Sequence, residues 1–247
     1  PPTPNHQPTN PKNLETKDLI EAKVVELGNF NPSRDLADDT KVVVLANAEK
    51  LEEAQAEALL SFTLNGGGLW ICHGDQVNAE WYNRSLGPDG SNLLPLQLRN
   101  LGGSLTDDSI RTRVVAAHFD HPALSLFNDP RNGNLADADV WRWQRLEEPQ
   151  DLMEKETTIL ARFETGDPFL AERKIGKGLV MQMSTSADGD WNNFPVRACF
   201  LPLIQQIASY LANQITPPRN LPTGSTNTHY LPESTAGSSV ESPDSYT

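Results

Sequence analysis

The hydrophobic pattern is clearest between residues 41 and 75, where two apolar runs flank an amphipathic segment. Residues 42–45 and 69–72 are apolar without a polar break, which is typical of parallel strands that are covered on both faces. Between them, apolar side chains recur at spacings of three and four, as on a helix over residues 50–64 that lies against a sheet; these are Leu51, Ala54, Ala58, Leu59 and Phe62. Glycines at 66–68 suit the end of a helix. The stretch therefore predicts a β-α-β unit, and with it a parallel sheet.

Polar residues directly follow two of the predicted strands. One polar turn comes after residues 69–72, and a second polar loop comes after a predicted buried strand at 179–183. Open α/β sheets bind ligands beyond the carboxyl ends of their strands, so we expect the binding site at this edge. The candidate ligand-binding residues are His73, Gly74, Asp75, Gln76, Ser184, Ser186, Asp188 and Asp190.

The rest of the pattern predicts more strands and two more helices. Residues 140–146 alternate Trp with Arg and Gln, as a half-exposed antiparallel strand does, and Gly176 to Gly178 predict a hairpin turn. The strand at 22–27 is expected nearer the sheet edge than the one at 42–45. The other predicted strands are at 111–117, 157–163, 169–174 and 179–183.

The two further helices are expected at residues 76–86 and 196–211. Asp75 is the predicted N-cap of the first. A side chain of the loop at 190–193 is the predicted cap of the second, and two aromatic side chains are expected to hold that loop to the core. The candidate caps are Asp190, Asn192 and Asn193, and the aromatic residues are Trp191 and Phe194.

Composition separates a central domain from its two ends. Residues 1–13 are rich in proline and predict a linker, residues 14–215 predict one α/β domain, and residues 216–247 are rich in Ser, Thr and Pro and predict a disordered tail. The formal charge of −13 argues against a nucleic-acid-binding surface, which needs a basic footprint. No apolar run is long enough to span a membrane. Because the chain begins with Pro1 rather than Met, we expect a fragment or a processed product.

Several stretches taken together resemble the glutamine-amidotransferase-like domain of bacterial membrane proteins of the aerotolerance (Bat) type. The resemblance implies a three-layer, flavodoxin-like α/β fold of the class I glutamine amidotransferase type, with a mostly parallel sheet and an added antiparallel region. It also implies a soluble segment of a longer, membrane-anchored chain, with other domains or a protein partner bound to it. The usual first strand of such a domain would then lie before the proline-rich arm. The stretches are residues 42–47, 66–69, 74–77, 81–83, 171–178, 184–186, 190–195 and 200–203.

Catalysis by the family's cysteine is not expected from these residues. Active class I glutamine amidotransferases carry a Gly-x-Cys-x-Gly turn that exposes the thiol. Cys72 and Gly74 match that turn, but Trp70 stands where its first glycine should be. The late His-x-Glu pair is also missing, since His229 is the only histidine after residue 122. We therefore expect a binding domain, with Cys72 and Cys199 as buried free thiols.

Two other functions stay open. One is an amidohydrolase or amidotransferase with Cys72 as nucleophile and His73, or a residue from another chain, as base. The other is saccharide binding, as in the trehalose-utilisation-like relatives of this fold.

No cofactor and no metal ion is expected. His118, Asp120 and His121 are too few for a metal site unless all three converge. The loop at 188–199 starts like a calcium loop but lacks its glycine and its final glutamate.

Overall fold

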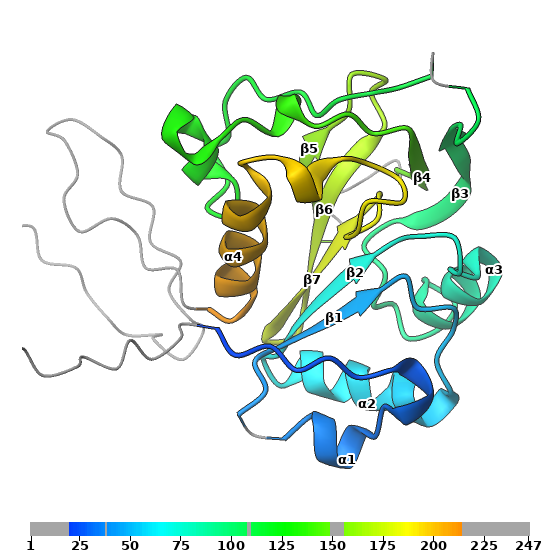
Figure 1. Cartoon of the computed structure of the whole chain (residues 1–247). Helices are drawn as coiled ribbons and strands as arrows, with labels where there is room; N and C mark the ends of the chain where they lie inside the picture. The colour runs from blue at the N-terminus through cyan, green and yellow to red at the C-terminus, as the bar shows by residue number, and fades with distance from the viewer. Residues whose placement is uncertain (1–19, 38, 108–109, 149–155, 214–247) are drawn as a thin grey trace, which may run out of the picture.

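The predicted β-α-β unit supplies two adjacent strands of a five-stranded sheet (Figure 1). The computed structural model describes residues 20–37, 39–107, 110–148 and 156–213. In it β1 (Val42–Ala46) leads through α2 (Glu53–Leu64) to β2 (Gly68–Cys72), and the two strands are parallel, with Val44 beside Trp70. β7 (Gly178–Met183) lies parallel to β2 on its other side. The predicted parallel sheet is confirmed.

An antiparallel hairpin extends this sheet, and a second sheet stands apart from it. β6 (Pro168–Ile175) pairs antiparallel with β7 through the predicted turn, in which Gly176 has a φ of 57°. β5 (Thr157–Arg162) pairs antiparallel with β6, which gives the order β1-β2-β7-β6-β5. β3 (Gln97–Gly103) and β4 (Arg142–Glu147) form a separate antiparallel pair. The α/β class and the added antiparallel region are therefore confirmed.

Helices cover both faces of the large sheet because successive strand residues point to opposite sides. Leu69 and Ile71 pack with Leu59 of α2 in one buried cluster. Trp70 and Cys72 pack in the other cluster, which includes the buried face of α4 (Phe200–Leu211). Full burial of one such aliphatic side chain stabilises the fold by roughly 1.5–3 kcal/mol, so cover from both sides explains the uninterrupted apolar run of β2. The same prediction is wrong for residues 42–45, because β1 is the edge strand and its Val44 is 47% exposed.

Short elements connect these layers. α1 spans Pro32–Asp35, α3 spans Ala79–Trp81, and a π-helical turn, η2, spans Tyr82–Leu86. No helix among the described residues is both long enough and apolar enough to cross a membrane. The 3-10 helices are η1 (Leu27–Asn29), η3 (Ser125–Asn128), η4 (Pro130–Asn132), η5 (Leu135–Asp137) and η6 (Phe194–Val196).

Two of the predicted strands are wrong. Residues 22–27 form no strand: Val24 is 95% exposed and the segment ends in η1, so β1 is itself the edge of the sheet. Residues 111–117 form only isolated bridges, from Thr112 to Val140 and from Val114 to Phe163. A short apolar run does not by itself specify which strand it pairs with.

The buried face of α2 also differs from the prediction. Ala54 is exposed, whereas Gln55 and Thr63 are buried. Gln55 Nε2 donates to the carbonyl of Phe30 (3.0 Å), and Thr63 Oγ1 donates to the carbonyl of Leu59 (2.8 Å). Buried polar side chains are tolerated when they are hydrogen-bonded. Because the buried face of α2 includes these two polar residues, the spacing of apolar residues alone did not predict it.

Both predicted helix caps after the core unit are wrong. The helix expected at 76–86 starts later, at Ala79, and its N-cap is Asn78, whose Oδ1 accepts from the amide of Trp81 (2.9 Å). The final helix starts at Phe200, with Cys199 at the N-cap position and Val196 outside it. The candidate caps Asp190, Asn192 and Asn193 bond within their own loop or to residues 137–141 instead.

The predicted linker, residues 1–13, and the predicted tail, residues 216–247, lie outside the described residues. Trp191 and Phe194 are buried, as predicted for the residues that hold the last loop to the core.

Candidate functional site

The carboxyl ends of β2 and β7 lie side by side, which brings together the two polar segments that the sequence singled out. The amide of His73 donates to the carbonyl of Met183 (3.4 Å), at the point where both strands end. Further out, Trp191 Nε1 donates to Oδ1 of Asp75 (2.7 Å). This bond ties the turn after β2 to the loop after β7, and it occupies the carboxylate that was expected to cap a helix.

Gly74 is required at this turn by the close approach of β1. A Cβ atom at Gly74 would lie 2.3 Å from Oδ1 of Asn47. That oxygen accepts from the amide of Gln76 (2.8 Å), and Asn47 itself has a left-handed φ of 51°. Asparagine is one of the few residues besides glycine that adopt this backbone conformation readily. The turn is therefore held in one conformation by its neighbour.

His73 lies beneath this edge, fully buried. Gln182 Nε2 lies 3.0 Å from Nε2 of His73 and also donates to the carbonyl of Leu96 (3.1 Å). Since the amide nitrogen can only donate, Nε2 of the imidazole is the acceptor and the proton sits on Nδ1. Burial lowers the pKa of His73 to about 3, so the ring is neutral.

The two serine candidates are buried as well. Ser184 Oγ donates to the carbonyl of Phe169 (3.2 Å), and Ser186 Oγ lies 3.3 Å from the carbonyl of Asp188 and accepts from the amide of Trp191 (3.3 Å). Both hydroxyl groups therefore organise the loop. Asp188 and Asp190 are exposed on that loop.

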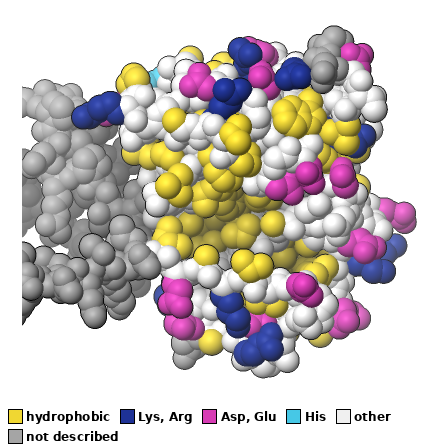
Figure 2. Space-filling view, in the orientation of Figure 1, with side chains coloured by type: hydrophobic (Ala, Val, Ile, Leu, Met, Phe, Trp, Pro, Cys, Tyr) yellow, Lys and Arg dark blue, Asp and Glu magenta, His cyan; other side chains and the backbone are white. Residues whose placement is uncertain are grey.

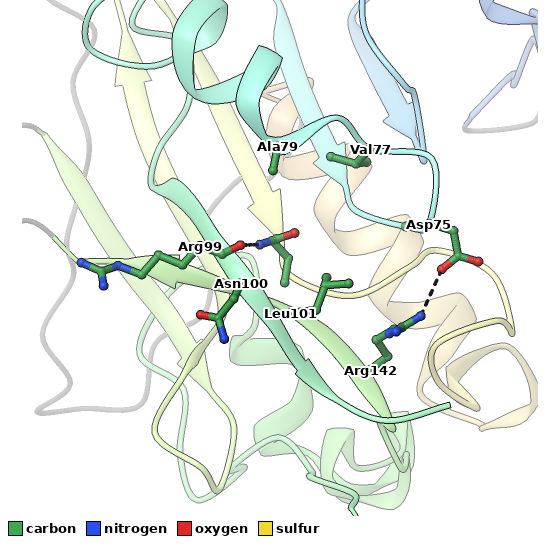
Figure 3. Close-up of a pocket in the computed structure, with 9 residues that line it drawn as sticks. Asp75, Val77, Ala79, Arg99, Asn100, Leu101 and Arg142 are labelled. Atoms are coloured by element: carbon green, nitrogen blue, oxygen red, sulfur yellow. Dashed lines mark hydrogen bonds and ion pairs between the residues drawn. The ribbon is translucent and has the colours of Figure 1, made fainter. Parts of the chain in front are cut away.

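A pocket of about 390 Å³ opens at this edge (Figure 3). Of the predicted site residues, Gly74 and Asp75 line it. Most of the opposite wall comes from the β3–β4 sheet, which sequence reasoning did not connect with the site. The lining residues are Gly74, Asp75, Val77, Ala79, Arg99, Asn100, Leu101, Arg142 and Gln144.

The guanidinium of Arg142 is one of the charged groups that line the pocket. It reaches toward Asp75, with Nη1 3.7 Å from Oδ1, and lies over the ring of Trp191 at 6.0 Å from the centroid (Figure 3). Its Nε is buried and has no hydrogen-bond partner among the described residues. The nearest Asp75 oxygen lies 3.7 Å from Nη1 and already accepts from Trp191 (2.7 Å), so Asp75 leaves Nε of Arg142 without a partner.

The other basic residue contributes less to the pocket. Arg99 Nη2 pairs with Oε1 of Glu147 (2.6 Å), and its side chain points away from the Arg142–Asp75 pair in Figure 3. Gln144 Nε2 donates to the backbone carbonyl of Arg99, which ties β4 to β3. One signal in the sequence pointed here: the alternation at 140–146 placed Arg142 and Gln144 on one face of a strand.

Cys72 is not placed as a nucleophile. Its thiol is fully buried in the cluster under α4, and burial, followed by the charge of Asp188, raises its pKa. The neighbouring His73 instead contacts Tyr82, in the other cluster, with ring centroids 6.2 Å apart. A reactive cysteine needs an accessible thiolate, and this environment favours the neutral thiol.

The histidine pair near residue 120 does not converge. His118 Nε2 lies 3.3 Å from Oδ1 of Asp120, whereas His121 Nε2 lies 3.5 Å from Oε1 of Glu172. Within the described ranges, no group of three His, Cys, Asp or Glu side chains is arranged to hold a metal ion.

Comparison with known proteins finds similarity in fold but not in sequence. No family model and no curated protein matches the chain. Among solved structures it is similar to the cytoplasmic proteins STM3548 and STM1381 of Salmonella typhimurium, with TM-scores of 0.54 and 0.52 and identities of 12% and 13%. Each of these matches covers 69% of this chain and 71% of the other. At these identities the likeness shows the α/β fold alone.

A third similar structure is a beta-galactosidase from Bacillus circulans sp. alkalophilus. Its TM-score is 0.47 at 17% identity, over 69% of this chain and 22% of the enzyme. A likeness of that size carries no argument about activity.

Proposed function

We propose that this chain is a non-catalytic glutamine-amidotransferase-like domain of a membrane-anchored bacterial protein, and that it binds a small polar ligand with an anionic group at the carboxyl edge of its sheet. The observation that carries the proposal is the pocket between the turn after β2 and the β3–β4 sheet. A carboxylate or phosphate oxygen at Arg142 would satisfy the donors that Asp75 leaves free.

The fold supports this assignment. Three parallel strands, helices on both faces and a pocket beyond the carboxyl ends of the strands are the arrangement in which open α/β sheets bind ligands. The finer assignment, a flavodoxin-like domain of the class I glutamine amidotransferase type, rests on the motif resemblance. Fold alone does not grant the activity of a family, and the burial of Cys72 favours binding over catalysis.

The proposal is tested by a binding screen on the purified chain. Thermal unfolding is followed with small carboxylates, phosphate monoesters, sugar acids and neutral saccharides, and hits are titrated by calorimetry. We expect anionic compounds to raise the melting temperature. A charged hydrogen bond contributes roughly 1.5–3 kcal/mol, so Arg142→Met is expected to weaken binding by roughly 10- to 150-fold.

Arg145→Met is the matched control. Arg145 lies on the same strand and carries the same charge, but it pairs with Asp167 (3.6 Å) and does not line the pocket. Its replacement is expected to leave binding unchanged. Absence of any shift across the panel, or equal loss in the two variants, would refute the proposal. Tight binding of neutral saccharides with no dependence on Arg142 would favour the saccharide-binding alternative.

A further inference from the structure

The outer backbone edge of β3 is open where the strand passes the pocket. Gln144 of β4 stands opposite Leu101, but its amide donates to the carbonyl of Ser184 (2.7 Å) and not to β3. Leu101 and Gln144 therefore form a non-hydrogen-bonded pair of the antiparallel ladder, in which the N–H and C=O groups of Leu101 point away from β4. No described residue bonds to these groups on that side. Unpaired groups on a strand edge are a template for another extended chain.

The open part of the edge begins at a defined residue. Three positions before Leu101, Asn83 bonds to both backbone groups of Leu98: Nδ2 donates to the carbonyl (2.8 Å), and Oδ1 accepts from the amide (2.7 Å). A side-chain amide thus takes the place of a partner strand and ends the free edge there. Further along the strand, Leu101 lines the pocket of about 390 Å³ that separates β3 from the turn after β2.

Arg142 marks the other end of this open part. It stands opposite Gly103, two positions after Leu101. Figure 3 shows its guanidinium and the Asp75 carboxylate reaching toward each other across one end of the pocket. The charged lining residues are two arginines and one aspartate, in a chain whose formal charge is −13. This end therefore favours an anionic group, and a ligand chain that carries the anion on its last atoms does not have to pass the Arg142–Asp75 pair.

The wall between the two ends is partly apolar. Leu101 is 43% exposed, and Val77 and Ala79 lie across the pocket from it, on the side of the turn after β2 (Figure 3). Covering exposed apolar surface is favourable in proportion to the area removed from water. The pocket therefore favours a ligand that combines an anionic end with an apolar side chain and with backbone groups that match the edge of β3.

We propose that the pocket binds the carboxyl-terminal end of a peptide, which adds a short strand to the edge of β3. The inference rests on the proposed function and identifies its anionic group as a terminal carboxylate. With that carboxylate at Arg142 and the preceding residues toward Asn83, the peptide runs parallel to β3. Strand addition to a free edge and capture of a terminal carboxylate are both common modes of peptide recognition.

Parallel pairing defines the contacts of the last three peptide residues. A residue of one strand bonds to the two neighbours of the residue opposite it. The amide of Leu101 then donates to the carbonyl of the third residue from the end, and the carbonyl of Leu101 accepts from the amide of the last residue. The penultimate residue stands opposite Leu101, so its side chain lies beside the leucine. Three extended residues span roughly 10 Å.

Calorimetric titration of the 247-residue chain with the tripeptide acetyl-Ala-Leu-Ala tests the proposal. Its carboxyl-terminal amide is expected to bind roughly 10- to 150-fold more weakly, because the charged hydrogen bond to Arg142 is lost. A methyl group on the last amide nitrogen removes the donor to Leu101 and is expected to weaken binding roughly 2- to 10-fold. N-acetylalanine carries the carboxylate but reaches only one backbone group of Leu101, and it is expected to bind at least about tenfold more weakly.

The outcomes separate this inference from the proposed function. Equal binding of the tripeptide and N-acetylalanine, both lost in Arg142→Met, would overturn the peptide assignment and leave the anion site standing. Equal binding of the tripeptide acid and its amide, or no effect of the methyl group, would also overturn the assignment. Binding of none of these carboxylates, while phosphate monoesters or sugar acids bind through Arg142, would do the same.

A matched pair of variants controls for apolar contact elsewhere. Figure 2 shows hydrophobic side chains gathered in a hollow between α4 and the parallel strands. Val44 of β1 stands beside Trp70 of the cluster under α4 and, at 47%, is about as exposed as Leu101. Leu101→Ser is expected to weaken tripeptide binding about 3- to 10-fold, and Val44→Ser to leave it unchanged. The reverse result would mean that the peptide binds in the hollow, which would overturn the proposal.

Hydrogen exchange supplies a readout at the predicted contact itself. With free tripeptide at about ten times its dissociation constant, exchange of the Leu101 amide is expected to slow about tenfold. The amide of Leu98, which already bonds to Asn83, is the internal control and should change little. Saturating tripeptide with no change at Leu101 would refute strand addition.

Discussion

His73 is expected to make this protein acid-sensitive well above the pH at which carboxylates titrate. The ring is fully buried, no carboxylate contacts it among the described residues, and burial lowers its pKa to about 3. In the unfolded chain the same ring has a pKa of about 6.5. The folded state therefore holds a neutral ring while the unfolded state takes up a proton. Stability from this group is present above pH 6.5 and is lost as the pH falls toward 3.

The size of the effect follows from that difference. Each pH unit below 6.5 favours unfolding by about 1.4 kcal/mol until the folded state also binds the proton. Between pH 6.5 and pH 4.5, His73 alone is expected to remove about 2 kcal/mol from the free energy of unfolding, because at pH 6.5 the unfolded ring is already half protonated. Marginal domains have only about 5–15 kcal/mol in total. The window ends at pH 4.5 because other groups contribute below it. Arginine partners lower the carboxyl pKa values of Asp35, Asp139 and Glu148, so the stability that these carboxylates contribute is lost at lower pH.

Urea unfolding at several pH values measures the effect. The wild-type chain is compared with His73→Gln, which cannot titrate, and with His118→Gln, a control at an exposed histidine. The wild type and the control are expected to lose about 2 kcal/mol across the window, and His73→Gln much less. Equal pH dependence in the wild type and His73→Gln would refute the reasoning, because it would show that His73 is hydrated or charged in the folded state.

Two other predictions concern the turn after β2. In a Cys199→Ala background, an aromatic disulfide reagent is expected to label Cys72 at least about 1,000-fold more slowly in the folded chain than in urea. Only the opened state, in which the thiol has its ordinary pKa, reacts, so the labelling rate is expected to rise about tenfold per pH unit between pH 6 and pH 8. Fast labelling with a flat pH profile would indicate an activated nucleophile. Gly74→Ala is expected to destabilise the fold by about 1–3 kcal/mol through contact with Asn47, whereas Gly28→Ala, which meets no atom within 4 Å, should change the melting temperature little.

The parallel core could be predicted from sequence because its signals are local. Apolar runs at 42–45 and 69–72, and a run at 179–183 that is apolar except for Gln182, identify three parallel strands, and the hairpin glycines place the antiparallel extension. The strand at 22–27 was wrong because a short apolar run does not specify a neighbour. The caps were wrong because Asp75 had a competing donor, Trp191, more than a hundred residues away in sequence.

Only part of the candidate site could be predicted from the sequence, because the rest depends on contacts between residues far apart in the chain. Adjacency of β2 and β7 follows from topology rules, so the meeting of their two polar segments was predictable. The position of the β3–β4 sheet was not, because the alternation at 140–146 predicts a strand but does not say that it pairs with residues about fifty positions earlier. Arg142 was therefore predicted as a strand residue and not as part of the site. His73 and the two serines were predicted as ligand-binding residues, but they are buried, and hydrogen bonds to Gln182, Phe169 and Asp188 allow that burial.

The split construction of the pocket has an evolutionary consequence. Its floor belongs to a rigid turn in which Gly74 tolerates no side chain, whereas its opposite wall belongs to a separate two-stranded ribbon that shares no backbone ladder with the large sheet. Under the proposed function, mutations at Leu101 or Arg142 would therefore change which ligand binds without disturbing the large sheet beneath. Ligand specificity and the stability of the fold would then depend on different parts of the chain, so the first could evolve without loss of the second.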